Sequence, residues 1–148
     1  MMGIPGGGKS TWIRNNVSND AVICSADHFF EDKQGNYNWN PKQATIAHIV
    51  CMKKYLNALD NPAVQHIVVD NTNTTKSTMR NYVLEANKRG YPVNIVAILA
   101  DPHIAASRNV HNVPAETIHT MHKELWKTIQ SGFPDNWQVS RFVFENSK

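Results

Sequence analysis

The sequence predicts an α/β domain with a mainly parallel sheet, for two reasons. Short apolar runs typical of buried strands alternate along the chain with segments whose apolar residues recur at helical spacing. The chain also opens with a glycine-rich stretch, GIPGGGKS, directly before the first helical segment. At 148 residues, of which 41% are hydrophobic and 18% charged, the chain has the length and composition of one globular domain.

Four helices are predicted from the spacing of apolar residues. Pro41 suits the first position of the second helix, where its missing N–H costs nothing. Gly90 is expected to close the third helix as its C-cap. The predicted helices cover residues 9–17, 41–59, 74–90 and 114–132. The apolar stripe of the second helix, which is expected to face the core, consists of Ile49, Met52, Leu56 and Leu59.

Four short runs are predicted to be strands of the sheet. A polar connection, residues 101–113, links the third strand to the last helix. Residues from about 102 to 113, within this connection, are in the usual place for a mobile lid. The predicted strands are residues 21–24, 65–70, 93–100 and 138–145.

The stretch GIPGGGKS fits the pattern G-x-x-x-x-G-K-[ST], with Gly3, Gly8, Lys9 and Ser10 at the fixed positions. In such a loop, backbone N–H groups and the first turn of the following helix bind phosphate. Lys9 is expected to reach the β- and γ-phosphates of ATP, and Ser10 to ligate Mg²⁺. A surface glycine turn is the alternative. The predicted nucleotide-binding residues are Gly3, Pro5, Gly6, Gly7, Gly8, Lys9, Ser10 and Thr11.

The motif refines the fold class to the three-layer P-loop NTPase and kinase fold, in which the phosphate loop follows a central parallel strand. Only Met1 and Met2 precede Gly3. The predicted sheet therefore has one strand fewer than a nucleoside-phosphate kinase sheet. We expect the first central strand to be truncated or missing, with Met1 and Met2 as its last residues in an N-terminally clipped chain. A genuine start with a short stub strand is the alternative.

Three charged residues are candidates for chemistry. Asp70 ends the apolar run HIVV, where an acid can hold Mg²⁺ directly or through water, or cap the following turn. Asp27 follows the first strand and could accept a proton from an attacking hydroxyl, although a turn role explains its position equally well. Arg108 lies in the expected lid, where a cation could offset charge during transfer or remain a solvated surface group.

Composition favours a cytoplasmic protein. Cys24 and Cys51 stand in apolar surroundings without metal-ligand spacing, which is typical of buried thiols in a reducing compartment. The sequence has no apolar run of about 18 residues and no signal-peptide pattern at its start. The net charge of +3 is compatible with a polyanionic substrate without requiring one.

Several motifs together resemble the P-loop kinases related to polynucleotide 5′-hydroxyl kinase: GIPGGGKSTW, ICSADHFF, GNYNWNP, VVDNTN and RNVHNVP. The resemblance runs from Gly3 to about Trp126. It implies that Lys9 and Ser10 bind the ATP phosphates and Mg²⁺. It also implies that Asp27 is the general base for the substrate hydroxyl and that Arg108 is a lid arginine that contacts the nucleotide phosphates.

We therefore predict an ATP- and Mg²⁺-dependent kinase that transfers the γ-phosphoryl group to a hydroxyl, with a polynucleotide 5′-hydroxyl as the favoured acceptor. Polynucleotide kinases often carry a second acid and an arginine just after the base, whereas His28, Phe29 and Phe30 follow Asp27 here. A small-molecule kinase of the same fold therefore remains an alternative. A third possibility is a binding module that uses ATP to set its conformation without transferring phosphate.

Overall fold

A computed structural model describes the backbone of residues 1–144 and the side chains of residues 1–139. The four predicted strands are present as β1 (Val22–Cys24), β2 (Ile67–Val69), β3 (Asn94–Leu99) and β4 (Gln138–Phe144). Glu145, the predicted last residue of the fourth strand, lies outside the described residues. All pairing between these strands is parallel, with β1 beside β2 and β3 beside β4.

Met1 and Met2 lie between the two strand pairs and join them into one sheet. Met2 forms a parallel bridge with Ala97 of β3, in which its N–H donates to Val96 O (2.9 Å) and its carbonyl accepts from Ile98 N (2.8 Å). On the other side, the amino group of Met1 donates to Val69 O of β2 (3.0 Å). The two residues thus hold the central position predicted for the strand before the phosphate loop.

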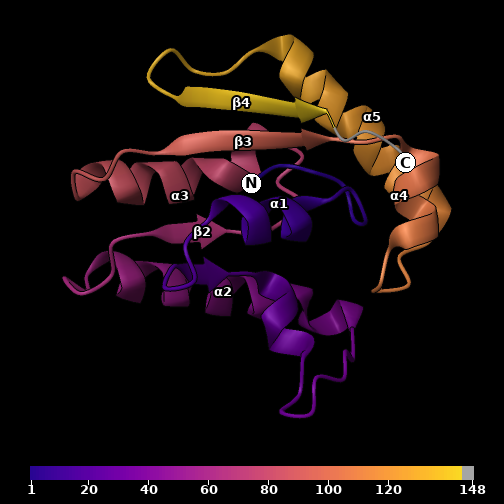
Figure 1. Cartoon of the computed structure of the whole chain (residues 1–148), viewed down its shortest axis with the longest axis horizontal. Helices are drawn as coiled ribbons and strands as arrows, with labels where there is room; N and C mark the ends of the chain where they lie inside the picture. Colours follow the sequence, from indigo (N-terminus) through magenta and orange to yellow (C-terminus); the bar gives the residue numbers. More distant parts are fainter. Residues whose placement is uncertain (145–148) are drawn as a thin grey trace.

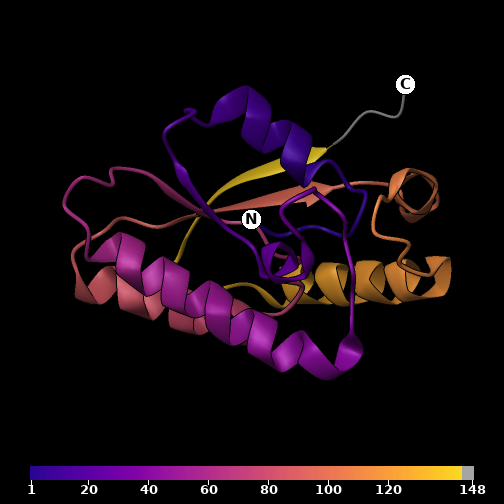
Figure 2. The same ribbon diagram turned by 90° about the horizontal axis from the view of Figure 1, so that it is seen from below.

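Helices cover both faces of the sheet, which confirms the three-layer α/β fold. Figure 2 shows α1 (Lys9–Asn16) on one face and α2 (Ala44–Leu59), α3 (Lys76–Lys88) and α5 (Ala115–Ser131) on the other. In Figure 1, the phosphate loop and α4 (Pro102–Arg108) lie toward the arrowheads of β3 and β4. The carboxyl ends of the parallel strands therefore share the edge of the sheet at which this fold binds ligands.

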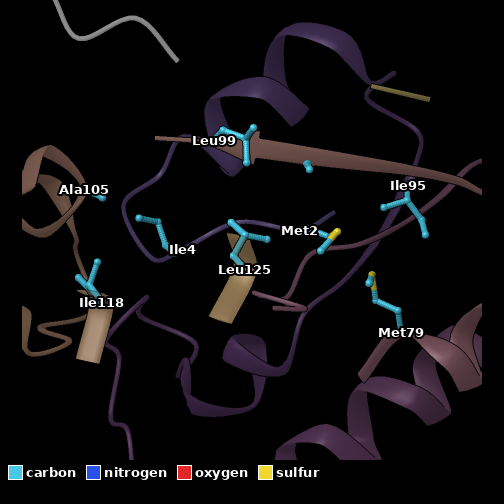
Figure 3. Close-up of a cluster of buried hydrophobic side chains, with 9 residues drawn as sticks. Met2, Ile4, Met79, Ile95, Leu99, Ala105, Ile118 and Leu125 are labelled. Atoms are coloured by element: carbon cyan, nitrogen blue, oxygen red, sulfur yellow. The ribbon is translucent and has the colours of Figure 1, made fainter. Parts of the chain in front are cut away.

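Two hydrophobic clusters form the core. The first packs the start of the chain against β3, α4 and α5, and Figure 3 shows Met2 and Ile4 among its side chains. The second packs α2 against β1 and the 3₁₀ helix η1 (Ala26–Phe30). Both predicted thiols, Cys24 and Cys51, are buried in this second cluster. The buried members of the first cluster are Met2, Ile4, Met79, Ile95, Ala97, Leu99, Ala105, Ile118 and Leu125.

The predicted core stripe of α2 is wrong at Ile49, whose exposed fraction is 62%. The first turn of the predicted helix is instead a 3₁₀ helix, η2 (Pro41–Gln43), with α2 beginning at Ala44. Small side chains at Ala47 and Cys51 allow the helix to approach β1 and η1 closely, so the buried face is rotated from the one predicted. The buried residues of α2 are Ala47, Cys51, Tyr55, Ala58 and Leu59.

The connection over residues 101–113 was predicted without a helix, and this prediction is wrong because α4 lies within it. The sequence does carry a start signal for α4. Asp101 is the N-cap and accepts a hydrogen bond from His103 N (2.8 Å), and Pro102 occupies the first turn. Helix α3 ends at Lys88 with Arg89 as its C-cap, so Gly90, the predicted C-cap, lies one residue further on, at a φ of 76°.

A cavity of about 760 Å³ adjoins Met1, with the facing strands β2 and β3 in its lining. Among the described residues, the only backbone pairing that bridges these two strands runs through Met1 and Met2. Most of the lining is apolar or aromatic, including Val68, Tyr82 and Val93. The inner edges of β2 and β3 can therefore accept a further extended segment in line with Met1.

An extension of about five apolar, β-favouring residues ahead of Met1 should raise the melting temperature. Such a segment would pair with both strands and fill the cavity, and each buried side chain contributes about 1.5–3 kcal/mol to the free energy of unfolding. It also replaces the buried amino group of Met1, whose pKa burial lowers to about 6, by a neutral peptide N–H. Thermal unfolding without ligand measures the effect.

A glycine-serine extension of the same length is the matched control, because it makes the same covalent change without apolar side chains. Equal melting temperatures for the two extended proteins would show that the cavity does not accept a strand.

Candidate functional site

The glycine-rich loop is anchored in the core at one end and begins α1 at the other. Ile4 is completely buried, and its carbonyl accepts a hydrogen bond from Gly7 N (3.0 Å). The N–H of Gly3 donates to Thr72 O (2.9 Å), which ties the start of the loop to the segment after β2. The loop is therefore held at its base while its glycines remain at the carboxyl edge of the sheet.

Gly6 permits a close approach between the loop and α4. Its φ is 73°, and a Cβ placed there would lie 2.1 Å from Ala105 O. Any side chain at this position would displace α4 or the loop, because the three nearest atoms, which come from Ala105 and Asn109, all belong to the backbone. Glycine at this position thus allows α4 to pack directly against the loop.

The amino end of α1 has the features of an anion-binding terminus. Its N-cap is Gly8, no side chain caps it, and no acidic residue lies in its first turn. The N–H groups of a first turn have no partner within the helix, and the dipole is positive at this end. Ser10 and Thr11, in this first turn, are exposed. The arrangement suits the phosphate groups of a nucleotide.

Lys9 lies at the centre of the candidate site. Its Nζ donates to the carbonyls of Gly3 (3.0 Å) and Ile4 (3.1 Å), so the side chain folds back over the loop. Burial lowers the pKa of Lys9, whereas the charges of Asp70 and then Asp27 raise it. Both carboxylates therefore lie within electrostatic range of the lysine, and the fold brings together three residues predicted from distant parts of the chain.

Asp70 directly follows β2, and its N–H donates to Cys24 O (2.8 Å) at the end of β1. Asp70 therefore lies at the carboxyl edge of the sheet, as predicted. The next residues form a polar network that sequence reasoning assigned no role. Asn71 Oδ1 accepts from Ala26 N (2.9 Å), and the buried Asn73 donates to Met1 O (2.9 Å). A run of polar residues directly after an apolar strand is the signal that predicts such a network.

Asp27 lies in η1, the 3₁₀ turn that follows β1. Ser25 caps this turn, because its Oγ accepts the N–H of Asp27 (3.2 Å). The carboxylate of Asp27 accepts a hydrogen bond from Tyr37 Oη (2.9 Å), and His111 Nδ1 lies 3.4 Å from its other oxygen. The Asp27 side chain is 47% exposed. Tyr37 and His111 are contacts that the sequence did not predict.

Arg108 lies in the last turn of α4 and is exposed. The loop that follows is closed by Asn109, whose side chain bonds both the N–H (2.8 Å) and the carbonyl (3.2 Å) of Val113. Arg108 and His111 thus belong to one short segment beside the glycine-rich loop. The predicted lid is part helix and part loop.

The parallel sheet, the glycine-rich loop and the α1 terminus define a P-loop nucleotide-binding domain. A family model described as an AAA domain matches residues 1–134, and the chain belongs to this family. The match supports membership of the P-loop kinase superfamily. None of the helices in residues 1–144 combines the length and the apolar character needed to cross a bilayer.

Replacing Lys9 by alanine should weaken ATP binding by about 10–100-fold, since a hydrogen bond to a charged group contributes about 1.5–3 kcal/mol. Titration calorimetry with ATP measures the affinity, and thermal unfolding checks the fold. Lys88→Ala is the control, because Lys88 lies at the end of α3 and pairs with Glu85. An unchanged ATP affinity in Lys9→Ala would remove the lysine from the nucleotide site.

Proposed function

We propose that the protein is an ATP- and Mg²⁺-dependent kinase that transfers the γ-phosphoryl group to a hydroxyl acceptor. The observation that carries this proposal is the placement of Asp27. A half-exposed carboxylate lies at the same sheet edge as Lys9 and within its electrostatic range. A nucleotide-binding module needs the loop and Lys9, but it has no use for a base directed at an acceptor.

The donor set fits a bound Mg²⁺. Ser10 offers an exposed hydroxyl in the first turn of α1, and Asp70 offers a carboxylate near Lys9. Mg²⁺ at phosphoryl-transfer sites usually takes one or two protein ligands and completes its coordination with phosphate and water. Ser10 and Asp70 would supply those ligands, and the ion would offset the negative charge of the phosphates.

The transfer assigns a separate task to each side chain. The acceptor oxygen forms the new bond to the γ-phosphorus, and the bond from that phosphorus to the β–γ bridging oxygen breaks, with its electron pair leaving on ADP. Asp27 takes the proton of the acceptor hydroxyl. Lys9 and the α1 terminus hold the phosphates, and Arg108 offsets charge that develops during the transfer.

For the acceptor, we propose the 5′-hydroxyl of a polynucleotide, on the strength of the resemblance in the five motifs given above. The test incubates the protein with γ-labelled ATP, Mg²⁺ and three classes of probe: 5′-hydroxyl RNA, 5′-hydroxyl DNA and small hydroxyl compounds. Label on an oligonucleotide end supports the proposed acceptor. Label on a small compound alone supports a kinase with another acceptor, and ATP binding without any labelled product supports the binding module.

Asp27→Asn should lower phosphoryl transfer by about 10²–10⁴-fold, because the amide keeps the shape of the side chain and removes its basicity. ATP affinity should stay within about threefold of the parent value, because Asp27 is not expected to bond the nucleotide. A threefold change in affinity is smaller than the loss of one hydrogen bond would cause. Single-turnover transfer and calorimetry give the two quantities. Asp135→Asn, an exposed acid ahead of β4 at the opposite edge of the sheet, is the control. Transfer at the parent rate by Asp27→Asn would make Asp27 a turn residue.

Arg108→Ala should lower turnover more than it lowers ATP affinity, because a lid cation acts mainly on charge that develops in the transition state. Catalytic arginines of this kind contribute about 10³-fold or more to the rate. Steady-state kinetics separates kcat from KM for ATP. Arg80→Ala, an exposed arginine on α3, controls for the loss of surface charge. If turnover is unchanged in Arg108→Ala, the residue has no part in transfer.

A further inference from the structure

Asp27 is contacted by two aromatic side chains, one from the loop ten residues after it and the other from a segment far away in the sequence. Tyr37 donates its hydroxyl to Oδ1 (2.9 Å), and Nδ1 of His111 lies 3.4 Å from Oδ2. The two rings also stack on each other, with centroids 3.9 Å apart and planes within 10°. We call Tyr37 and His111 the Asp27 clamp. One member comes from the loop before α2, and the other from the loop after α4.

The Tyr37 side of the clamp is held by a small hairpin. Glu31 and Tyr37 form an antiparallel bridge, and Asn38 N donates to Phe30 O (2.9 Å). The turn is closed by Asp32, whose Oδ1 accepts from Gln34 N (2.9 Å) and Asn36 N (2.8 Å). These bonds fix the backbone around Tyr37, so its ring is presented to Asp27 in a defined place.

The His111 side of the clamp belongs to the lid segment. Asn109 closes the loop by bonding both backbone groups of Val113, and Asn112 has a φ of 54°. His111 therefore lies in a tight loop that begins directly after Arg108. A movement of this loop relative to η1 would change the distance between the imidazole and the carboxylate.

The clamp orients the carboxylate of Asp27 without covering it. Burial, and then the hydrogen bond to Asp27, raise the pKa of Tyr37, so its hydroxyl stays protonated and donates. A carboxylate has two oxygens with about four lone-pair sites in all; the Tyr37 hydroxyl occupies one of them, and Nδ1 of His111 lies near the other oxygen. The side chain is still 47% exposed, which leaves room for an acceptor hydroxyl.

We propose that Tyr37 and His111 are positioning residues for Asp27, and that His111 makes the alignment of the base depend on the position of the lid. This proposal rests on the proposed kinase function. The proton of the acceptor hydroxyl still moves to Asp27, while the acceptor oxygen forms its bond to phosphorus and ADP leaves. The clamp takes no part in bond making and acts by fixing where the carboxylate oxygen lies.

The test uses variants that separate the polar contact from the ring. Tyr37→Phe and His111→Phe keep an aromatic ring and remove the hydroxyl or the nitrogen. His111→Asn restores an amide N–H close to the position of Nδ1. Single-turnover transfer from Mg·ATP to a 5′-hydroxyl RNA oligonucleotide should fall by up to about 10²-fold in both phenylalanine variants, because small misplacements of a reacting group have effects of this size. His111→Asn should recover most of the loss.

Two further readouts distinguish positioning from a general structural effect. Affinity for Mg·ATP should stay within about threefold of the parent value, because the clamp contacts Asp27 and not the nucleotide. Loss of even one hydrogen bond to the nucleotide would have a larger effect. Tyr37→Phe should also cause almost no additional loss when combined with Asp27→Asn, because residues that act through one group are not additive. Parent-like rates in the phenylalanine variants, parallel loss of Mg·ATP affinity, or full additivity with Asp27→Asn would each overturn the proposal.

Amide hydrogen exchange tests the clamp independently of the reaction. His111→Ala should speed exchange at Asn36 and Asn38, far away in the sequence, because it removes the ring that packs on Tyr37. Val110→Ala is the matched control, since Val110 is in the same loop and 82% exposed. If the parent protein labels no oligonucleotide or small hydroxyl compound, the kinase proposal fails. Faster amide exchange in His111→Ala would still show that the clamp contact exists. Unchanged exchange in His111→Ala would show that the clamp is not formed in solution, and the inference would fail.

Discussion

The pairing of Met2 with β3 is the interaction on which the rest of the structure depends. Its two hydrogen bonds, to Val96 O and from Ile98 N, fix the residue that directly precedes the glycine-rich loop. The amino group of Met1 bonds Val69 O of β2, so the same short segment links the two halves of the sheet. Since Met2 and Ile4 are both completely buried, the start of the loop cannot shift without opening the first core cluster.

From this fixed point, the parallel topology determines which residues meet. Each strand ends at the same edge, so the loop, the segment after β2 and the turn after β1 converge there. The backbone at Thr72 and the side chains of Asn71 and Asn73 bond these three segments to one another. Buried polar side chains are stabilising only when they are hydrogen-bonded. This network therefore helps to hold Asp27 and Asp70 at the carboxyl edge of the sheet, where Lys9 also lies.

The sequence predicts those features that depend on local patterns, and these include the α/β class, the glycine-rich loop and the strands. Parallel strands end at the same edge of a sheet, and Lys9, Asp27 and Asp70 each lie in or just after a segment at that edge. Their nearness could therefore be expected from the sequence. The buried face of α2 could not, because the large apolar residues Ile46, Ile49 and Val50 are exposed while the small residues Ala47 and Cys51 are buried. The Asp27 clamp could not be predicted either, since Tyr37 and His111 are 74 residues apart and no local sequence pattern indicates that their rings stack.

The two halves of the candidate site differ in how far they are formed in this conformation. On the acceptor side, Asp27 already has its Tyr37 hydrogen bond and a nearby imidazole, and its carboxylate remains half-exposed. On the phosphate side, Lys9 bonds two carbonyls of its own loop, and burial disfavours its charge. A phosphate that entered the loop would replace those carbonyls as the partner of the ammonium group and would favour its charged form. Under the proposed function, we therefore expect nucleotide binding to reorganise the loop around Lys9, whereas the position of Asp27 is set by η1, the hairpin and the loop after α4.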